Sequence, residues 1–527
     1  MSLMNGGQAL IQSLHRHGVR VVFGLPGAGQ YEAVDALYDF PDIQYISTRH
    51  EQAVSYMADG YARVTGKPGV GIVVEGAGFF NTTAGLATAF AASSPVLIIT
   101  GNRHHTSDAG LAGFDGLACH RQYAKWAGRA NTPAEIPAIV NEAFRQLQTG
   151  RRRPVIVEIA PTTFAAKEEV SLLEVPTYPP TGGDPDVLAQ AAHLLANAQR
   201  PLIWAGGGAN SSGAGEAVRA LAEHLKATVV SSKSGKGVVS DHHPLSLGMV
   251  NLAFQPLKAW VDSRDVILVV GLGGGFNAQS GHQKIIRIDI DPGEISRSNP
   301  SDVRVLGDAK VCVEELLRLV TATTQPRPNY PEQVHQINRQ RFGPEEQLQP
   351  QADFMRAIRA AIPDDGILAQ GMNQMGYYSR NYYPVFSPNA YLTATSQSTL
   401  GLAYPIALGA KLGQPGRAVV SLSGDGGFLY NAQELATAMQ YGINVVAIVF
   451  NDNAYGNVLR SQLVNFGGRV IGTRLRNPSF VQLGEAFGAR SVLAESADQL
   501  ETAVREAIAA ETPALIEVPV GAMERKY

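Results

Sequence analysis

One stretch constrains the fold of this chain more than any other: GDGGFLYNAQELATAMQYGINVVAIVFNDNAYG, which begins at Gly424. An apolar run over 418–422 leads into Gly-Asp-Gly, a helical segment follows, and a second apolar run over 445–450 ends in Asn-Asp-Asn. This pattern predicts a strand–helix–strand unit of a parallel sheet. Asp425 and Asp452 then lie just past the carboxyl ends of neighbouring strands, where open α/β sheets bind their ligands.

The chemistry of these residues favours a divalent cation and a phosphate. Asp425 and Asp452 stand 27 positions apart, which is one crossover, so both carboxylates can face one hard cation. Gly426 and Gly427 are expected to leave backbone N–H groups bare where the helix opens, an arrangement that suits a phosphate. Magnesium is usually held by one or two carboxylates together with phosphate oxygens and water. We therefore expect Mg²⁺ beside a phosphorylated ligand.

The pattern of Gly-Asp-Gly, about two dozen residues and an Asn pair resembles the diphosphate-binding signature of thiamine-diphosphate (ThDP) enzymes. These are the relatives of acetolactate synthase, benzaldehyde lyase and benzoylformate decarboxylase. Asp452 departs from the family, which usually has Asn there, and it adds a negative charge beside the diphosphate. The resemblance implies a metal held by Asp425, Asp452 and the backbone carbonyl near Ala454. It also implies cofactor contacts from Gly424, Gly426, Gly427, Tyr455 and Gly456.

A second segment, STRHEQAVSYMADGYAR, begins at Ser47 and resembles the activating segment of the same family. A strand over 44–47 is expected to lead into a helix with Ala53 and Met57 at core spacing. In the family, a glutamate at the position of Glu51 contacts N1′ of the aminopyrimidine. The resemblance implies that Glu51 favours the imino tautomer, whose 4′-nitrogen takes the proton from C2 of the thiazolium.

A third segment, TSQSTLGLAYPIALGAKL, precedes the Gly-Asp-Gly strand. It resembles the family segment that presses an apolar side chain between the two cofactor rings, which places Leu400 in that role. The carbonyl of Ser398 would then accept from the 4′-amino group. Further upstream, GMNQMGYY resembles the loop that clasps the diphosphate, with Asn373 as the side-chain donor.

The length of the chain and its alternating apolar runs predict an α/β protein made of three doubly wound parallel-sheet domains. With 527 residues the chain is too long for a single core. We expect a pyrimidine-binding domain over 1–165, a Rossmann-like middle domain over 180–325 and a diphosphate-binding domain over 350–527. A Pro-rich linker over 175–184 and a polar segment over 321–333 separate them. Further strands are expected at 19–23, 70–74, 96–100, 155–159, 202–205, 229–231, 266–270, 285–290 and 366–370.

Composition excludes several classes of protein. The net charge is −3, with 45% apolar and 17% charged residues, so the balance indicates neither a nucleic-acid partner nor a membrane partner. The basic run 151–153 is interpreted as a solvated loop. The two cysteines, Cys119 and Cys312, fit a reducing cytoplasm, and neither a secretory signal nor a membrane-spanning run is expected.

The middle domain contains two glycine-rich turns, AGGGAN over 205–210 and GLGGGF over 271–276. Neither forms a full GxGxxG with an acidic residue at the right distance, so each indicates a dinucleotide only weakly. Some relatives hold FAD in this domain. An arginine is expected near Gly275 in flavin-binding members and is missing here, which weighs against FAD.

The resemblance also implies which side chains face the substrate. Glu75 stands where several decarboxylases have His and synthases have Ser, and it is expected to point into the cleft and handle protons. His104, His105 and His120 are interpreted as solvated loop residues. The substrate pocket is expected to include Phe114 together with Ala28, Gly29 and Gly116, three positions where relatives place polar groups.

The resemblance implies a ThDP- and Mg²⁺-dependent enzyme that makes or breaks C–C bonds next to a carbonyl. Its substrates would be 2-oxo acids or 2-hydroxy ketones, and the reaction would pass through an enamine. Alternatives are an acetolactate synthase that carries FAD, a simple 2-oxo acid decarboxylase, and a catalytically idle binding subunit. In this family two chains share each site, so a homodimer within a homotetramer is expected.

Overall fold

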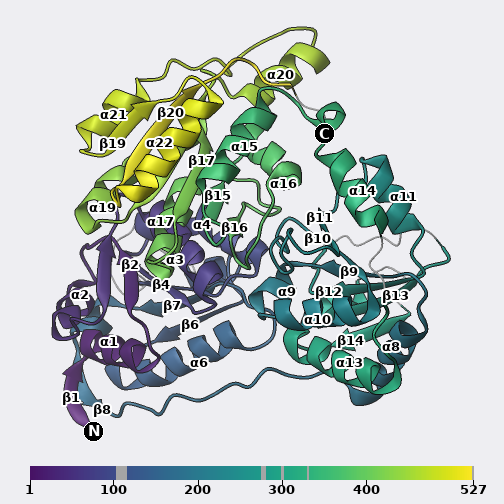
Figure 1. The fold of residues 1–527 in the computed structure, drawn as a ribbon. Helices are drawn as coiled ribbons and strands as arrows, with labels where there is room; N and C mark the ends of the chain where they lie inside the picture. The colour runs from purple at the N-terminus through teal and green to yellow at the C-terminus, as the bar shows by residue number, and fades with distance from the viewer. Residues whose placement is uncertain (102–115, 275–280, 298–301, 329–331, 525–527) are drawn as a thin grey trace.

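A computed structural model describes residues 1–101, 116–274, 281–297, 302–328 and 332–524. It contains three parallel sheets of six strands each, and helices cover both faces of every sheet (Figure 1). The predicted fold class, three α/β domains, is confirmed. The central strands are runs of branched apolar residues such as Val96–Thr100, which are buried along their whole length, as parallel strands between two helical layers must be.

The first sheet has the strand order β3-β2-β4-β5-β7-β6. Its strands are β2 (Val21–Gly24), β3 (Gln44–Ser47), β4 (Gly69–Val73), β5 (Val96–Thr100), β6 (Trp126–Ala130) and β7 (Val155–Ile159). Its helices are α1 (Gly6–Arg16), α2 (Tyr31–Ala36), α3 (Glu51–Thr65), α4 (Ala77–Ala92), α5 (Gly116–His120), α6 (Ile136–Gln148) and α7 (Pro161–Ala165). A small antiparallel pair, β1 (Ser2–Asn5) with β8 (Lys167–Val170), ties the start of the chain to the end of this domain.

The middle sheet has the order β11-β10-β9-β12-β13-β14, the arrangement of a dinucleotide-binding fold. Its strands are β9 (Pro201–Ala205), β10 (Thr228–Ser231), β11 (Ser246–Met249), β12 (Val266–Val270), β13 (Lys284–Asp289) and β14 (Val303–Leu306). Its helices are α8 (Pro185–Asn197), α9 (Gly207–Ser211), α10 (Gly215–Leu225), α11 (Gln255–Asp262), α12 (Pro292–Ser296) and α13 (Ala309–Thr323).

The third sheet has the order β16-β15-β17-β18-β20-β19. Its strands are β15 (Ile367–Gln370), β16 (Tyr391–Leu392), β17 (Val419–Gly424), β18 (Val445–Asn451), β19 (Arg490–Leu493) and β20 (Ala514–Pro519). Its helices are α15 (Gln351–Ala361), α16 (Gln374–Tyr382), α17 (Ala403–Gly413), α18 (Asp425–Phe428), α19 (Glu434–Tyr441), α20 (Gly456–Asn465), α21 (Phe480–Ala486) and α22 (Ala497–Ala509).

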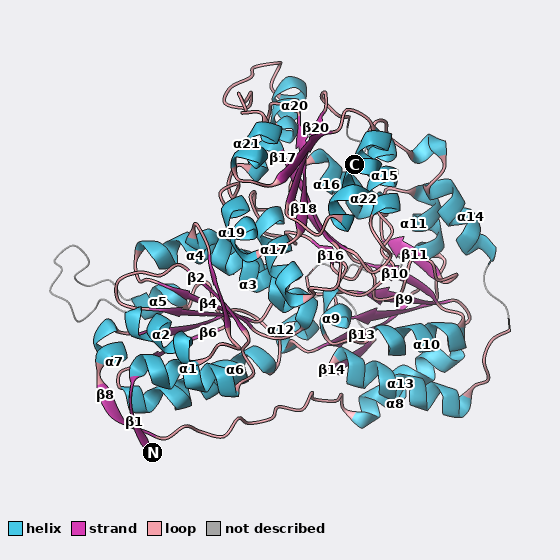
Figure 2. Ribbon diagram, turned by 60° about the vertical axis from the view of Figure 1, so that its left-hand side comes forward, coloured by secondary structure: helices cyan, strands magenta, loops and turns pink. Residues whose placement is uncertain are grey.

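The first and third sheets share one topology. When the strands of each are numbered along the chain, both sheets have the order second, first, third, fourth, sixth, fifth. Helices α3 and α17 both follow the second strand of their sheets, and they pack against each other between the two domains (Figures 1 and 2). The two halves of the expected cofactor site are therefore built on equivalent scaffolds.

The predicted strands at 44–47, 96–100, 155–159 and 266–270 are confirmed residue for residue, and the others are confirmed to within two residues. The linker over 175–184 has neither helix nor strand, as expected. The segment 321–333 was expected to be a polar connection, yet α13 continues to Thr323 and helix α14 (Glu332–Arg341) begins at its other end. Val334 and Ile337 of α14 pack against the middle sheet.

Neither cysteine forms a disulfide, and Cys312 is buried. Among the residues that the structure describes, no helix is both long and apolar enough to cross a lipid bilayer.

Candidate functional site

Asp425 is the first residue of α18, directly after β17, and the residue is 2% exposed. It accepts hydrogen bonds from the N–H of Gly426 (2.7 Å) and the N–H of Ala454 (3.2 Å). The expectation of a bare N–H at Gly426 is therefore wrong, because the neighbouring carboxylate engages that group. Burial raises the pKa of Asp425, although these N–H groups oppose the shift.

Asp452 follows β18 and lies beside Asp425. Its carboxylate accepts from the same N–H of Ala454, at 3.2 Å. Burial and the negative charge of Asp425 raise the pKa of Asp452 to about 6. A side chain at Gly456, the first residue of α20, would approach the Asp452 carboxylate to 2.1 Å and would displace it. The two carboxylates repel each other and both accept from one backbone N–H. A cation bound between them would offset this repulsion.

Sequence reasoning missed Asn477, which lies in the loop before α21. Its amide Nδ2 donates to Asp425 at 2.7 Å and to the side-chain oxygen of Asn451 at 3.0 Å. The residue lies 52 positions beyond Asp425 in a segment without an apolar pattern, so no local signal marks it. A lone asparagine before a proline would be interpreted as a turn.

The segment that precedes α17 has an unusual backbone. Thr395 and Ser398 adopt φ angles of 53° and 54°, and Asn453, next to Asp452, adopts 51°. Positive φ is uncommon for residues other than glycine, and such strain gathers at functional sites. Leu400 is half-buried, and a side chain added at Gly427 would come within 3.9 Å of its Cδ2 atom. Gly427 and Leu400 thus lie next to each other.

Asn373 caps helix α16, where its side-chain oxygen accepts from the N–H of Gly376 at 2.9 Å. Its Nδ2 donates to the carbonyl of Leu422 on β17 at 3.2 Å. A side chain at Gly424 would lie 3.1 Å from its Cβ. Asn373 therefore lies against the Gly-Asp-Gly turn, as the sequence predicts.

Glu51 is the first residue of α3, and His50 caps this helix by accepting from the N–H of Gln52 at 3.1 Å. The Glu51 carboxylate is half-buried and accepts from Nδ2 of Asn81 on α4 at 2.9 Å. A side chain at Gly78 would approach Glu51 to 3.3 Å.

The start of α3 contacts the third domain within the same chain. Asn431 donates from Nδ2 to the side-chain oxygen of Gln52 at 3.2 Å and to the carbonyl of Gly401 at 2.8 Å. The hydroxyl groups of Tyr56 and Thr399 are 3.0 Å apart. The residues next to Glu51 thus meet the segment that contains Leu400.

Glu75 lies past the end of β4, half-buried, beside the turns that follow β2 and β5. A side chain at Gly101 would approach its Oε2 atom to 2.3 Å, and one at Gly29 to 3.3 Å. The structure thus brings Glu75 and Gly29 together, as the sequence predicts. Ala28 is exposed and Gly116 is buried at the start of α5. Phe114, His104 and His105 lie outside the described residues.

The interpretation of His120 as a solvated loop residue is wrong. It ends α5, is 5% exposed, packs against Phe79 and lies 2.8 Å from the carboxylate of Glu158 through Nδ1. Arg129 pairs with the other oxygen of Glu158 at 2.6 Å. Burial would raise the pKa of Glu158, but the hydrogen bonds from His120 and Arg129 hold it below its usual value.

Comparison with known proteins agrees with this geometry. Residues 4–122 match the N-terminal TPP binding domain of thiamine pyrophosphate enzymes, residues 188–316 match their central domain, and residues 370–518 match their C-terminal TPP binding domain. A probable acetolactate synthase large subunit from Methanocaldococcus jannaschii is 32% identical over 99% of this chain and 93% of its own length.

This chain belongs to the thiamine-diphosphate-dependent enzymes related to acetolactate synthase. Other relatives are a probable 2-ketoarginine decarboxylase from Pseudomonas aeruginosa, 33% identical over 98% of this chain and 94% of its own length, and the acetolactate synthase isozyme 3 large subunit from Escherichia coli, 29% identical over 96% and 93%. The protein is a ThDP-dependent enzyme of the acetolactate-synthase type.

The residues around Asp425 fit a ThDP enzyme's diphosphate and its metal. Among the described residues, no group of three or more His, Cys, Asp and Glu side chains could hold a metal by itself. Two carboxylates suffice for Mg²⁺, because this ion keeps phosphate oxygens and water in its shell.

The middle domain of this ThDP enzyme borders a cavity of about 640 Å³ against the first domain. Its glycine turns pack against each other. A side chain at Gly206 or Gly208 would come within 2.2 or 2.7 Å of the backbone of Gly271. The N–H of Gly274 donates to the carboxylate of Glu294 at 2.8 Å. The two turns are thus used for contacts within the domain.

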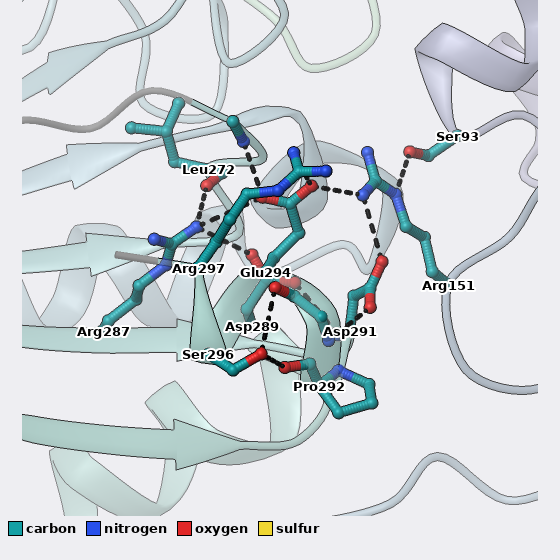
Figure 3. Close-up of polar contacts among 12 residues, drawn as sticks. Ser93, Arg151, Leu272, Arg287, Asp289, Asp291, Pro292, Glu294, Ser296 and Arg297 are labelled. Carbon is teal, nitrogen blue, oxygen red and sulfur yellow. Dashed lines mark hydrogen bonds and ion pairs between the residues drawn. The ribbon is translucent and has the colours of Figure 1, made fainter. Parts of the chain in front are cut away.

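The rim of this cavity also corrects the interpretation of the run 151–153 as a solvated loop. Arg151 donates to Ser93 (2.8 Å), to Glu294 (2.8 Å) and to Asp291 (3.1 Å), and so joins the first domain to the middle one (Figure 3). Glu294 also pairs with Arg297 at 3.3 Å. These contacts fix the first domain against α12.

Proposed function

We propose that this protein is a ThDP- and Mg²⁺-dependent enzyme that forms or cleaves the C–C bond next to the carbonyl of 2-oxo acids or 2-hydroxy ketones. One observation supports this most. The carboxylates of Asp425 and Asp452, at the ends of neighbouring strands, both lie 3.2 Å from the N–H of Ala454.

We assign the metal to Asp425, Asp452 and the carbonyl of Ala454. The turns around Gly424, Gly426, Gly427, Tyr455 and Gly456, with Asn373, would bind the diphosphate. Leu400 would separate the two rings, and the carbonyl of Ser398 would accept from the 4′-amino group. The positive φ of Ser398 supports a functional role for this turn, because uncommon backbone conformations cluster at functional sites.

When it is bound, the cofactor supplies a carbanion equivalent at the substrate's carbonyl carbon. Glu51 would hold the proton at N1′ of the pyrimidine, and Asn81, which donates to it at 2.9 Å, would keep its carboxylate oriented. The buried carboxylates of the third domain would orient the diphosphate through the metal. The protein's own contribution is thus to orient the cofactor and to move one proton.

Glu75 is proposed to handle protons on the substrate side. It lies between Gly29 and Gly101, and Ala28 and Gly116 add no ionisable side chain to this region. A reactive carbon that meets few proton donors lives longer and can attack a second carbonyl. This supports carboligation or acyloin cleavage over simple decarboxylation.

Acetolactate synthesis and 2-oxo acid decarboxylation remain as candidate reactions, because relatives of this chain are named for them. Several relatives are named acetolactate synthases, and one 33% identical is named a 2-ketoarginine decarboxylase. We further propose that FAD is not a cofactor, since the arginine expected near Gly275 in flavin-binding members of the family is missing from this chain. The visible absorbance of the purified protein tests this directly.

The test of the proposed function uses Asp425→Ala. The variant should keep its far-UV circular dichroism but lose ThDP binding in calorimetry with Mg²⁺ present. Unchanged ThDP affinity would overturn the assignment. For the reaction, a 2-oxo acid offered with an aldehyde should give an acyloin, and Glu75→Gln should lower turnover while sparing cofactor binding. Free aldehyde as the main product with every pair would favour the decarboxylase.

A further inference from the structure

A single helix of the third domain contacts the backbone just before Glu51. The carboxylate of Glu434, the first residue of α19, accepts from the N–H of Arg49 through both oxygens, at 3.1 and 3.2 Å. The N–H of His50 also contributes a hydrogen bond to it. Glu434 is fully buried, and the hydroxyl of Thr437 donates to it at 2.6 Å.

The same helix makes two more contacts with this segment. The N–H of Ser47, at the end of β3, donates to the hydroxyl oxygen of Tyr441 at 2.9 Å. The guanidinium of Arg49 donates to the side-chain oxygen of Gln440 at 2.7 Å. Residues 47–50 are thus held from one side, over the whole turn between β3 and α3.

A buried carboxylate is a costly way to bind backbone N–H groups, because the ion must leave water. A neutral acceptor such as Gln or Ser could satisfy one N–H at lower cost. An ionised carboxylate forms stronger hydrogen bonds and has two oxygens for two donors. The charge of Glu434 lies against the backbone of Arg49, which is two residues before Glu51. Packing alone does not explain a carboxylate at this place.

We propose that Glu434 is a positioning residue for Glu51: its ionised carboxylate fixes the backbone at Arg49 and His50, and so fixes where α3 presents Glu51 to the cofactor. This inference rests on the proposed role of Glu51 in ThDP activation. Glu434 itself touches neither the metal ligands nor the expected cofactor rings.

The surroundings of Glu434 make its charge sensitive to pH. Burial raises the pKa of Glu434 to about 7, against the opposing hydrogen bonds from Thr437 and from the backbone of Arg49 and His50 and the charge of Arg49. From α17, the Tyr404 hydroxyl also faces it, and burial together with the Glu434 charge raises the pKa of that tyrosine. Glu434 should gain a proton as the pH falls through about 7, and its hold on the two N–H groups should then weaken.

The experiment compares wild type with Glu434→Gln, which keeps size and removes the charge. Proton exchange at C2 of bound ThDP is followed by NMR from about pH 5.5 to about pH 8.5. Wild type should lose exchange rate below pH 7, by about tenfold for each unit of pH. The variant should exchange slowly at every pH, with ThDP affinity within about threefold of wild type.

Two further variants separate positioning from general packing. Glu434→Asp keeps the charge on a shorter side chain. It should show part of the pH dependence of C2 proton exchange that wild type shows. Tyr441→Phe, the matched control, removes the neighbouring contact to Ser47 and should leave the pH dependence of wild type unchanged. If Glu434→Gln does not fold, the pH profiles of Glu434→Asp and Tyr441→Phe are compared. A changed profile in Glu434→Asp alone supports the inference, and a wild-type profile in both contradicts it.

Amide hydrogen exchange of the cofactor-free protein supplies a readout that needs no catalysis. The protection of the Arg49 and His50 amides should fall below pH 7 in wild type and be low at every pH in Glu434→Gln. If wild type fails to bind ThDP, the proposed function fails, and this measurement still decides whether Glu434 holds the segment. An unchanged pH profile in Glu434→Gln, by either method, would overturn the inference.

Discussion

Glu51 illustrates how a single carboxylate depends on its immediate contacts. It begins α3 behind the His50 cap, and Asn81 donates to it from the neighbouring helix. A carboxyl that moves a proton to and from N1′ needs both the proton and a fixed orientation. The amide of glutamine keeps the shape and the hydrogen bond but cannot carry the proton.

Glu51→Gln should therefore bind ThDP normally and lose C2 proton exchange by about 10²–10⁴-fold, the usual contribution of general acid–base groups. NMR exchange at saturating cofactor measures this. Asn81→Ala serves as a comparison and should lose less, because it removes only the orienting contact. Exchange at the wild-type rate in Glu51→Gln would disprove the role.

Asn477 lies beside Asp425 and hydrogen-bonds to it. Its amide links Asp425 to Asn451, so it would keep one proposed metal ligand in place without touching the metal itself. Residues that hydrogen-bond to a metal ligand typically contribute about 10–100-fold to metal affinity. Asn477→Ala should weaken Mg²⁺ binding, measured by calorimetry in the presence of ThDP, by about 10–100-fold.

A fold control for Asn477→Ala is the nearby Asn465→Ala, an exposed helix residue that donates to Ser461. It should bind Mg²⁺ as wild type does. If the two variants behave alike, Asn477 has no specific effect on the metal site.

Single residues could be predicted from the sequence where their setting is local. Asp425, Asp452 and Glu51 each lie within a few residues of the end of a predicted strand, and the structure puts all three at strand ends or a helix start. Asn477, His120 and Glu434 could not be predicted, because each is defined by partners far away in the chain. The partner of Glu434, for example, lies 385 residues upstream.

At the scale of elements, helices α3 and α17 cross through two glycines. A side chain at Gly60 would come within 2.0 Å of the carbonyl oxygen of Ile406, and one at Gly409 within 1.9 Å of that of Met57. Each glycine thus packs against the residue three positions before the other glycine. This reciprocal pattern is that of a twofold contact between equivalent helices.

The symmetry of this crossing predicts that Gly60→Ala and Gly409→Ala have similar costs. Neither methyl group has room, so the helices must separate, and overpacking of this kind typically costs about 1–3 kcal/mol. Urea unfolding measures the change. Gly416→Ala, at a glycine where an added side chain meets open space, is the control and should change stability little.

The reciprocity can be contradicted in a simple way. If one of the two substitutions is neutral and the other severe, the close approach is not shared between the helices. The strands were predictable because their apolar runs are short, rich in β-branched residues and bounded by turn residues. The helix crossing was not, because a glycine within a helix pattern does not reveal which carbonyl it faces.

At the scale of the whole molecule, the main question is which chains complete a site. Residues next to Glu51 contact the third domain of the same chain through Asn431 and Thr399. In the family, the two halves that meet at one cofactor come from different chains. We propose the same arrangement here, in a homodimer within a homotetramer.

Subunit exchange tests this proposal. Glu51→Gln and Asp425→Ala proteins are each expected to be inactive. If sites are shared, a dimer of the two variants contains one site with both defects and one site with neither, so mixing should restore activity to up to about a quarter of wild type. Mixtures of each variant with itself are the control. A fully active monomer in sedimentation, or no recovery after proven exchange, would contradict shared sites.

The common strand order of the first and third sheets has a consequence for how this enzyme can change. Glu75 follows the third strand of its sheet, as Asp425 does in the other, and the Glu51 turn and the Leu400 segment both follow second strands. One scaffold thus occurs twice in the chain. In the proposed site, the third sheet binds the phosphates and the turn after β4 of the first sheet faces the substrate. If the proposed site is right, the turns after β2, β4 and β5 could adapt to new substrates while the turns after β17 and β18 continue to bind the diphosphate.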